Sequence, residues 1–252
     1  MPPLRLIARL DIKGPNVVKG IHLEGLRVVG DPGALARRYY EAGIDEILYI
    51  DIVASLYGRN NILSIVEAAA RDIFVPLTVG GGLRSVEDVV EALRHGADKV
   101  AINTAAIARP GFVREAAEAL GSQCIVVSIE AKQRGPGRWE AFTENGREAT
   151  GVDVLDWAVE AERLGAGELL VTSVDREGTK KGFDIALLKA IRERVRIPVI
   201  ASGGAGAPAH LEAALREESA DAVACASVLH YETHGVPEIK RELRAAGLEV
   251  RQ

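Results

Sequence analysis

The stretch PLTVGGGLRSVEDVVEALRHGADKVAINTA, residues 76–105, contains one complete unit of the expected fold. An apolar run at its start predicts a strand, and three glycines supply the turn that follows. Ser85 and Asp88 have the spacing of a capping box, so a helix begins there and ends near Gly96. A second apolar run then predicts another strand. This strand–helix–strand order indicates a parallel sheet.

The same alternation continues through the 252 residues. The predicted strands are short and mostly apolar, as parallel strands covered by helices should be. They lie at 5–11, 46–51, 76–80, 99–103, 124–130, 168–172, 198–202 and 222–226. Helices are predicted at about 31–43, 85–96, 110–121, 153–165, 184–194, 208–218 and 236–247. Eight strands that alternate with helices in this length predict an α/β fold, a single (β/α)8 TIM barrel. An open doubly wound sheet is the weaker alternative, because no Gly-x-Gly-x-x-Gly follows the first strand.

The two halves of the chain resemble each other. LDIK, PLTVGGGL and ADKVAINTA in the first half match IEAK, PVIASGGA and ADAVACASV in the second half. Three matches in the same order indicate a duplication, and internal repeats define architecture. The prediction is therefore one domain, 1–252, built from half-barrels of about 1–121 and 122–252.

Composition argues against several classes of protein. The net charge of −5 and an aromatic content of 4% do not suit a nucleic-acid binder. No apolar run is long enough to span a membrane. Cys124 and Cys225 lie in separate apolar segments, so a reducing cytoplasm is the expected location.

One segment interrupts the alternation. Residues 133–151 are polar and contain Gly-Pro-Gly and Asn-Gly, which predicts a hairpin-like excursion after the fifth barrel strand. A long loop on the catalytic face of a barrel suits a lid, and a solvated insertion is an equal alternative.

Two glycine turns predict a pair of phosphate sites. Each turn follows a strand, where glycine lets backbone N–H groups approach an anion. Polar side chains end the next strand in each half. The residues are Gly81, Gly82, Asn103 and Thr104 in the first half, and Gly203, Gly204 and Ser227 in the second. A single glycine pair is weak support, whereas its duplication in a barrel favours function.

Two acids end opposite strands of the predicted ring. Alternation places Arg9 and Asp11 on one face of their strand, and Glu130 ends the strand across the barrel. Two carboxylates at one mouth can divide general acid and general base roles. The alternative is that each acid pairs with a lysine, Lys13 or Lys132.

Four charged residues begin strands at the opposite end of the barrel. They are Arg5, Glu46, Lys99 and Glu168. Two positive and two negative charges can close a ring there, although spacing alone favours four solvated strand ends.

Together these residues resemble the cyclase subunit of imidazole glycerol phosphate synthase, the HisF family. The motifs are LDIKGPNVVKG at 10–20, TVGGG at 78–82, GADKVAINTAA at 96–106, GAGELLVTSVDREGTKKGFD at 165–184 and IASGGAG at 200–206. The resemblance implies a lyase of histidine biosynthesis that needs no cofactor or metal. In that family the partner is a HisH-like glutaminase subunit docked on the amino-terminal face of the barrel, and the resemblance implies the same here. Ammonia from that subunit passes up the barrel and reacts with a ribulosyl aminoimidazole bearing a phosphate at each end. The products are imidazole glycerol phosphate and an aminoimidazole carboxamide ribotide.

The resemblance also implies roles for individual residues. Asp11 and Glu130 match the catalytic pair, and the glycine turns with their polar neighbours match the phosphate sites. Lys19, Thr172 and Glu177 match substrate-side positions, with Lys19 on a mobile loop after the first strand. Arg5, Glu46, Lys99 and Glu168 match a gate for ammonia.

Three departures from the family pattern favour an alternative. Glu130 and Glu177 replace aspartates, and Arg9 replaces a small residue. By alternation Arg9 points into the barrel, where it should pair with Asp11 or Glu130 and lower that carboxylate's pKa. These departures resemble a paralogous branch that supplies ammonia for acetamidino groups on surface polysaccharides. A phosphorylated-sugar isomerase of the sister barrel family is the third hypothesis, and the charged strand starts argue against it.

Overall fold

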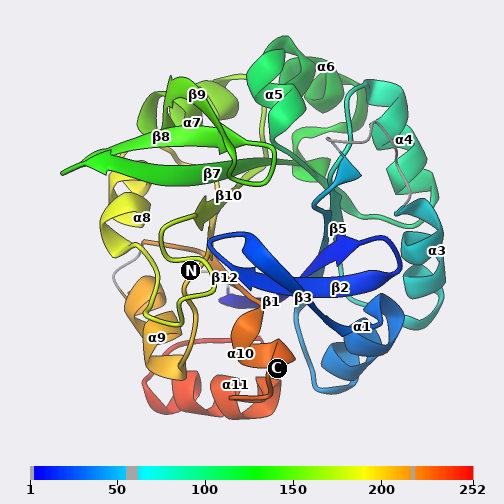
Figure 1. The fold of residues 1–252 in the computed structure, drawn as a ribbon, viewed down its shortest axis with the longest axis vertical. Coiled ribbons are helices and arrows are strands. Elements are labelled where there is room, and N and C mark those ends of the chain that lie inside the picture. Colours follow the sequence, from blue (N-terminus) through cyan, green and yellow to red (C-terminus); the bar gives the residue numbers. More distant parts are fainter. Residues whose placement is uncertain (1–2, 55–61, 217–218, 252) are drawn as a thin grey trace.

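The computed structural model describes residues 3–54, 62–216 and 219–251, and its core is a closed parallel barrel. The strands follow the order β10-β11-β12-β1-β4-β5-β6-β7, and β10 also pairs with β7, which closes the ring (Figure 1). This closure confirms the barrel and excludes the open sheet. The barrel strands are β1 (Arg5–Lys13), β4 (Glu46–Asp51), β5 (Leu77–Gly80), β6 (Lys99–Ile102), β7 (Ile125–Gly135), β10 (Glu168–Ser173), β11 (Val199–Ser202) and β12 (Ala222–Cys225).

Helices surround the barrel on its outer side (Figure 1). The longer ones are α1 (Pro32–Glu41), α3 (Leu63–Asp72), α4 (Val86–Arg94), α6 (Gly111–Leu120), α7 (Val154–Arg163), α8 (Ile185–Arg192), α9 (Pro208–Arg216) and α11 (Val236–Ala245). Shorter turns are α5 (Thr104–Ala108), η1 (Ser122–Cys124) and α10 (Ser227–His230). The predicted capping box of Ser85 and Asp88 is present at α4. The predicted end of α9 at 218 lies outside the described residues. No described helix has the length and apolar character needed to cross a membrane.

Apolar side chains form two layers on either side of the strands. The larger layer lies between the barrel and its helices. The smaller layer fills the barrel interior with Ile7, Leu48, Ala101, Val126, Leu170, Ile200, Ala222 and Ala224. Ile7 and Val126 therefore face inward, and by alternation so do Arg9 and Asp11 on β1 and Glu130 on β7. The division into half-barrels of about 1–121 and 122–252 stays a prediction.

Two antiparallel extensions rise from the carboxyl-terminal side of the barrel. β2 (Asn16–Ile21) and β3 (Glu24–Gly30) extend β1, and β8 (Arg138–Thr143) and β9 (Glu148–Asp153) extend β7. The hairpin-like excursion predicted at 133–151 is thus confirmed, with β7 itself running into it. The expected loop after the first strand is wrong: β2 and β3 form an ordered hairpin, because they pair with each other and with β1.

Candidate functional site

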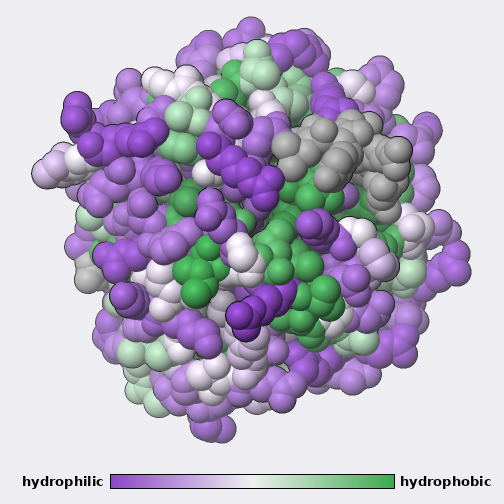
Figure 2. All heavy atoms as spheres, viewed as in Figure 1, coloured by the Kyte–Doolittle hydropathy of each residue, from purple (hydrophilic) through white to green (hydrophobic). Residues whose placement is uncertain are grey.

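The candidate site lies at the carboxyl-terminal end of the barrel strands, between the two extensions. Figure 2, drawn in the view of Figure 1, shows apolar atoms gathered near the centre of this face within a mostly hydrophilic surround. Ile21 and Val28, on the hairpin of β2 and β3, are 57% and 63% exposed. The mouth of the barrel is therefore partly apolar and bordered by charged groups.

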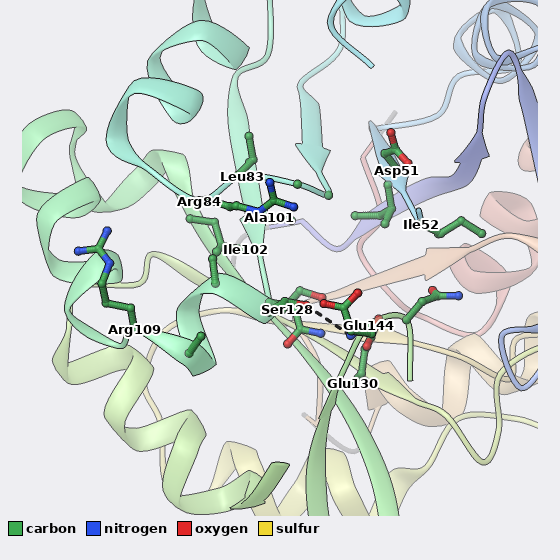
Figure 3. A pocket seen from close by; sticks show the side chains of 18 of the residues that line it. Asp51, Ile52, Leu83, Arg84, Ala101, Ile102, Arg109, Ser128, Glu130 and Glu144 are labelled. Carbon is green, nitrogen blue, oxygen red and sulfur yellow. Dashed lines mark hydrogen bonds between the residues drawn. The ribbon is translucent and has the colours of Figure 1, made fainter. Parts of the chain in front are cut away.

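The first glycine turn lines the larger cavity, which we call the first anion pocket. Its volume is about 320 Å³. Gly81, Gly82, Asn103 and Thr104 all line it, together with Arg84 and Arg109 (Figure 3). The four residues that sequence reasoning assigned to one phosphate site are thus brought together.

The second glycine turn lines a smaller cavity, the second anion pocket, of about 20 Å³. Gly203, Gly204 and Ser227 line it, with Lys19 and Glu177 at its edge. The structure therefore brings both predicted groups of anion-binding residues to one mouth. Lys19 comes to this pocket from β2, so the hairpin forms part of its lining.

Both turns require glycine. Gly81 has φ +100°, and a Cβ there would lie 2.2 Å from the carbonyl oxygen of Asp51. Gly204 has φ +108°, and a Cβ would lie 2.1 Å from the carbonyl oxygen of Gly182. Positive φ and this close approach exclude any larger side chain without backbone movement. The paired conformations agree with equivalent roles for the two turns.

Asp11 is buried and held by two cations. Arg9 Nε donates to Asp11 Oδ1 at 2.8 Å, and Lys19 Nζ lies 3.6 Å from Asp11 Oδ2. Burial alone would raise the pKa of this carboxyl, but the charges of Arg9 and Lys19 outweigh it and lower the pKa below its usual value. The pairing of Arg9 with Asp11 confirms the expectation from alternation. Among the contacts of the described residues, neither Lys13 nor Lys132 pairs with Asp11 or Glu130. Asp11 is therefore a carboxylate near neutral pH.

The pKa of Glu130 is shifted in the opposite direction from that of Asp11. Burial raises its pKa to about 7, although a hydrogen bond from Gly146 N at 2.8 Å and the charge of Arg9 act against burial. Gly146 follows β8, so the extension of β7 covers this carboxyl. Near neutral pH a large share of Glu130 is protonated. The two acids thus differ in proton occupancy, as a general acid and a general base must.

Three more predicted residues lie beside this pair. Thr172 is fully buried, and its Oγ1 accepts a hydrogen bond from Arg9 Nη1 at 2.8 Å. Glu177 forms an ion pair with Lys19, and its other oxygen accepts from Leu23 N at 3.1 Å. Lys19 was expected on a mobile loop after the first strand, but its side chain is buried, with only 3% of the residue exposed. These contacts tie the hairpin of β2 and β3 to the segment after β10.

The four strand-start charges form one closed ring, the charged ring. Arg5 lies 2.9 Å from Glu46 and 2.7 Å from Glu168. Lys99 lies 3.3 Å from Glu46 and 2.8 Å from Glu168. The alternative of four solvated strand ends is wrong, because each charge contacts two of opposite sign. The charged ring stands below the apolar layer inside the barrel, on the side away from the anion pockets.

Sequence reasoning missed four residues at the mouth. Asp51 lines the first anion pocket, and burial raises the pKa of its carboxyl. Arg84 and Arg109 bring positive charge to the same pocket (Figure 3). His230 is buried near Asp11, and burial lowers its pKa to about 4. Two of the four could have been found from the sequence, because Asp51 ends a strand and Arg84 lies two residues after the glycine turn.

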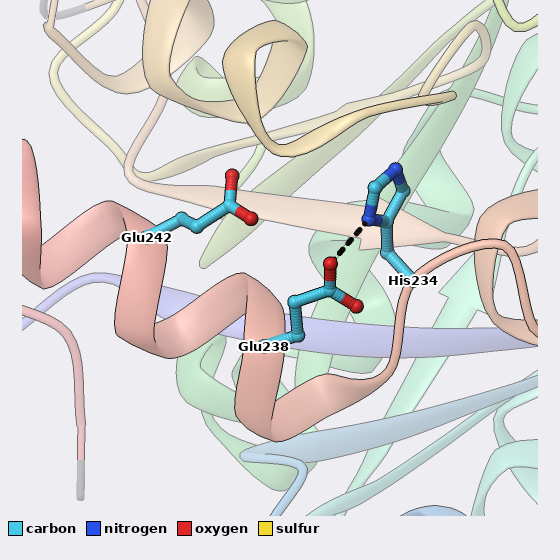
Figure 4. Close-up of side chains that lie close together, drawn as sticks. All are labelled: His234, Glu238 and Glu242. Carbon is cyan, nitrogen blue, oxygen red and sulfur yellow. Dashed lines mark hydrogen bonds and ion pairs between the residues drawn. The ribbon is translucent and has the colours of Figure 1, made fainter.

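A group of possible metal ligands lies away from this site. His234, Glu238 and Glu242 are close together at α11 (Figure 4). His234 Nδ1 lies 2.9 Å from Glu238 Oε1, so these two side chains already satisfy each other. His234, just before α11, and Glu238 are partly exposed, Glu242 is exposed, and none of the three lines either anion pocket.

Comparison with known proteins agrees with this geometry. The family described as "Histidine biosynthesis protein" matches residues 5–234. The chain is also 61% identical, over 206 residues, to the imidazole glycerol phosphate synthase subunit HisF of Legionella pneumophila. That alignment covers 82% of this chain and 97% of the relative.

Proposed function

This chain belongs to the histidine biosynthesis protein family, and from that premise we propose that it is the cyclase subunit of imidazole glycerol phosphate synthase. The observation that carries this proposal is the 61% identity to a HisF subunit along nearly the full length of that relative. The chain is thus an enzyme of histidine biosynthesis. Its substrate is a ribulosyl aminoimidazole with a phosphate at each end.

The two anion pockets supply the binding sites for that substrate. Backbone N–H groups of Gly82 and its neighbours, with Asn103 and Thr104, hold one phosphate. Gly203, Gly204 and Ser227 hold the other. Glycine turns suit this role because their backbone N–H groups reach an anion without side-chain hindrance. A ligand with phosphates in both pockets lies across the barrel mouth, above Asp11 and Glu130.

Asp11 and Glu130 carry out the proton transfers. Asp11 is ionised and accepts a proton, whereas Glu130 is partly protonated near neutral pH and donates one. Thr172 and Glu177 contribute through Arg9 and Lys19, to which they are bound. Lys19 reaches the second phosphate when its ion pair with Glu177 opens.

A HisH-like glutaminase subunit docks at the face that carries the charged ring, and its ammonia enters between Arg5, Glu46, Lys99 and Glu168. Phe74 supports this choice of face: it precedes β5 at the same end of the barrel and is 76% exposed. Exposed aromatic residues are common anchors of protein interfaces. Phe74→Ala should weaken the complex at least tenfold by calorimetry and leave ammonia-dependent turnover unchanged. Equal affinity of both proteins for the glutaminase would place the interface elsewhere.

The alternative of ammonia supply for acetamidino sugars is not favoured by the comparisons, since the identity is to a subunit of the histidine-pathway synthase. The direct test supplies the purified chain with the bis-phosphate substrate and ammonium salt. We expect release of the aminoimidazole carboxamide ribotide, and its loss in Asp11→Asn. A folded protein without turnover above background would refute the cyclase proposal.

A further inference from the structure

Arg9 occupies a position between the two anion pockets. Among the residues that the structure describes, Arg9 alone lines both of them. It stands on β1 and its side chain is 6% exposed. A ligand with one end in each pocket would therefore pass close to the Arg9 side chain.

The guanidinium is held in a fixed orientation from three sides. Nε donates to Asp11 on its own strand, and Nη1 donates to Thr172 Oγ1 on β10 and Ser202 Oγ on β11, at 2.8 and 3.1 Å. A guanidinium has five N–H donors. These contacts use three of them, and no acceptor for Nη2 occurs among the described residues.

The charges around Arg9 are already balanced. Arg9 and Lys19 face Asp11 and Glu177, and burial leaves Glu130 partly protonated and His230 neutral near pH 7. A further carboxylate or phosphate is therefore not required to neutralise Arg9. The free Nη2 donors suit a neutral oxygen acceptor, such as a hydroxyl or a carbonyl.

We propose that Arg9 is a substrate-binding residue that recognises an oxygen in the middle of a bis-phosphate ligand spanning both anion pockets. This inference rests on the proposed function for the nature of the ligand. Phosphate groups at the two ends give a ligand its placement. Arg9 adds selection for chains that carry a hydrogen-bond acceptor between them.

Lysine cannot replace arginine in this role. A single ammonium on a flexible stem lacks the planar set of donors that contacts Asp11, Thr172 and a ligand simultaneously. Arg9→Gln keeps much of the side-chain volume and an amide donor but removes the charge. These two substitutions separate geometry from charge.

The test measures binding of two ligands to the full chain by calorimetry, without ammonia so that no reaction occurs. One ligand is the bis-phosphate substrate and the other is inorganic phosphate, which occupies the end sites only. We expect Arg9→Ala and Arg9→Lys to weaken substrate binding at least tenfold and to change phosphate binding less than twofold. Lys13→Ala, which removes an exposed cation from the same strand, should leave both affinities unchanged.

Two results would overturn the inference. One is unchanged substrate affinity in Arg9→Ala. The other is an equal loss for substrate and phosphate, which would mean that Arg9 acts only through general charge. If Arg9→Ala does not fold, Arg9→Gln gives the same comparison at similar volume. Ammonia-dependent turnover of the unaltered chain is measured in parallel, so failure of the cyclase proposal is seen separately.

Discussion

Arg9 and Asp11, two residues apart on β1, form an ion pair of 2.8 Å at the mouth of the barrel. Both side chains face inward because strand residues alternate. The guanidinium contributes to the low pKa of Asp11 and also reaches Thr172 across the barrel. One side chain thus influences the protonation of Asp11 and also lines both anion pockets.

The protonation of Glu130 predicts the alkaline limb of the pH profile. Its pKa is raised to about 7 because the carboxyl is buried, so the donated proton is lost as pH rises through 7. We expect kcat/KM with ammonia to fall above that pH, since this ratio reports the pKa values of the free enzyme. Ammonia must be held constant as the unprotonated species at each pH.

Glu130→Gln should lower turnover by about 100-fold or more, in the range of general acid–base catalysis, and remove that limb. Asp11→Asn is the matched variant, because it removes the other carboxyl and should retain the limb in any residual activity. An unchanged profile in Glu130→Gln would assign the alkaline limb to another group.

The ion pair of Lys19 with Glu177 should protect the hairpin of β2 and β3 from local opening. Glu177→Gln keeps the side-chain shape and can still accept from Leu23 N, but it removes the charge that holds Lys19. We expect faster amide hydrogen exchange in β2 and β3 and tighter phosphate binding in the second pocket. Glu140→Gln, on the other extension, is the control. Equal exchange rates in the two variants would show that backbone pairing alone holds the hairpin.

His230 predicts a pH dependence of stability. Burial lowers its pKa to about 4, so the unfolded chain binds this proton more strongly than the folded chain between about pH 6.5 and 4. Its contribution is present above pH 6.5 and is lost as pH falls through 4. We expect the free energy of unfolding to fall over this window by less in His230→Asn than in the unaltered chain. Urea titrations at several pH values measure it, and parallel curves would contradict the role of His230.

A substitution in the charged ring should impair glutamine-dependent turnover more than turnover with added ammonium salt. Glu46→Gln leaves Arg5 and Lys99 with one shared carboxylate, and partial burial makes that loss cost about 1–3 kcal/mol of stability. Thermal unfolding measures this cost. In the complex, glutamine-dependent turnover should fall more than turnover with added ammonium salt. Equal reduction of both rates would mean that the ring has only a structural role.

Much of the barrel was predictable because each strand and helix has local signals. The capping box at Ser85 and the alternation that places Arg9 beside Asp11 needed only residues close in sequence. The hairpin of β2 and β3 was missed, because Gly14 and Pro15 interrupt its start and its pairing depends on β1. The contact of Lys19 with Glu177 joins residues 158 positions apart, and no local pattern encodes it.

In the candidate site, too, features encoded by neighbouring residues were predictable and features that depend on distant contacts were not. Glycine turns and strand-end acids were visible in the sequence, and the internal repeat related them. The raised pKa of Glu130 was not visible, because it comes from burial beneath the extension of β7. The unequal volumes of the two anion pockets, about 320 and 20 Å³, were likewise not visible in the sequence.

The charged ring has a consequence for assembly. Its two cations and two anions are paired before any partner arrives, so their side chains have little rotational freedom left to lose on association. Its net charge is zero, so it exerts little long-range attraction on an approaching subunit. The association rate at this face should therefore depend weakly on ionic strength, and the lifetime of the complex should be set by contacts outside the ring, such as those of Phe74.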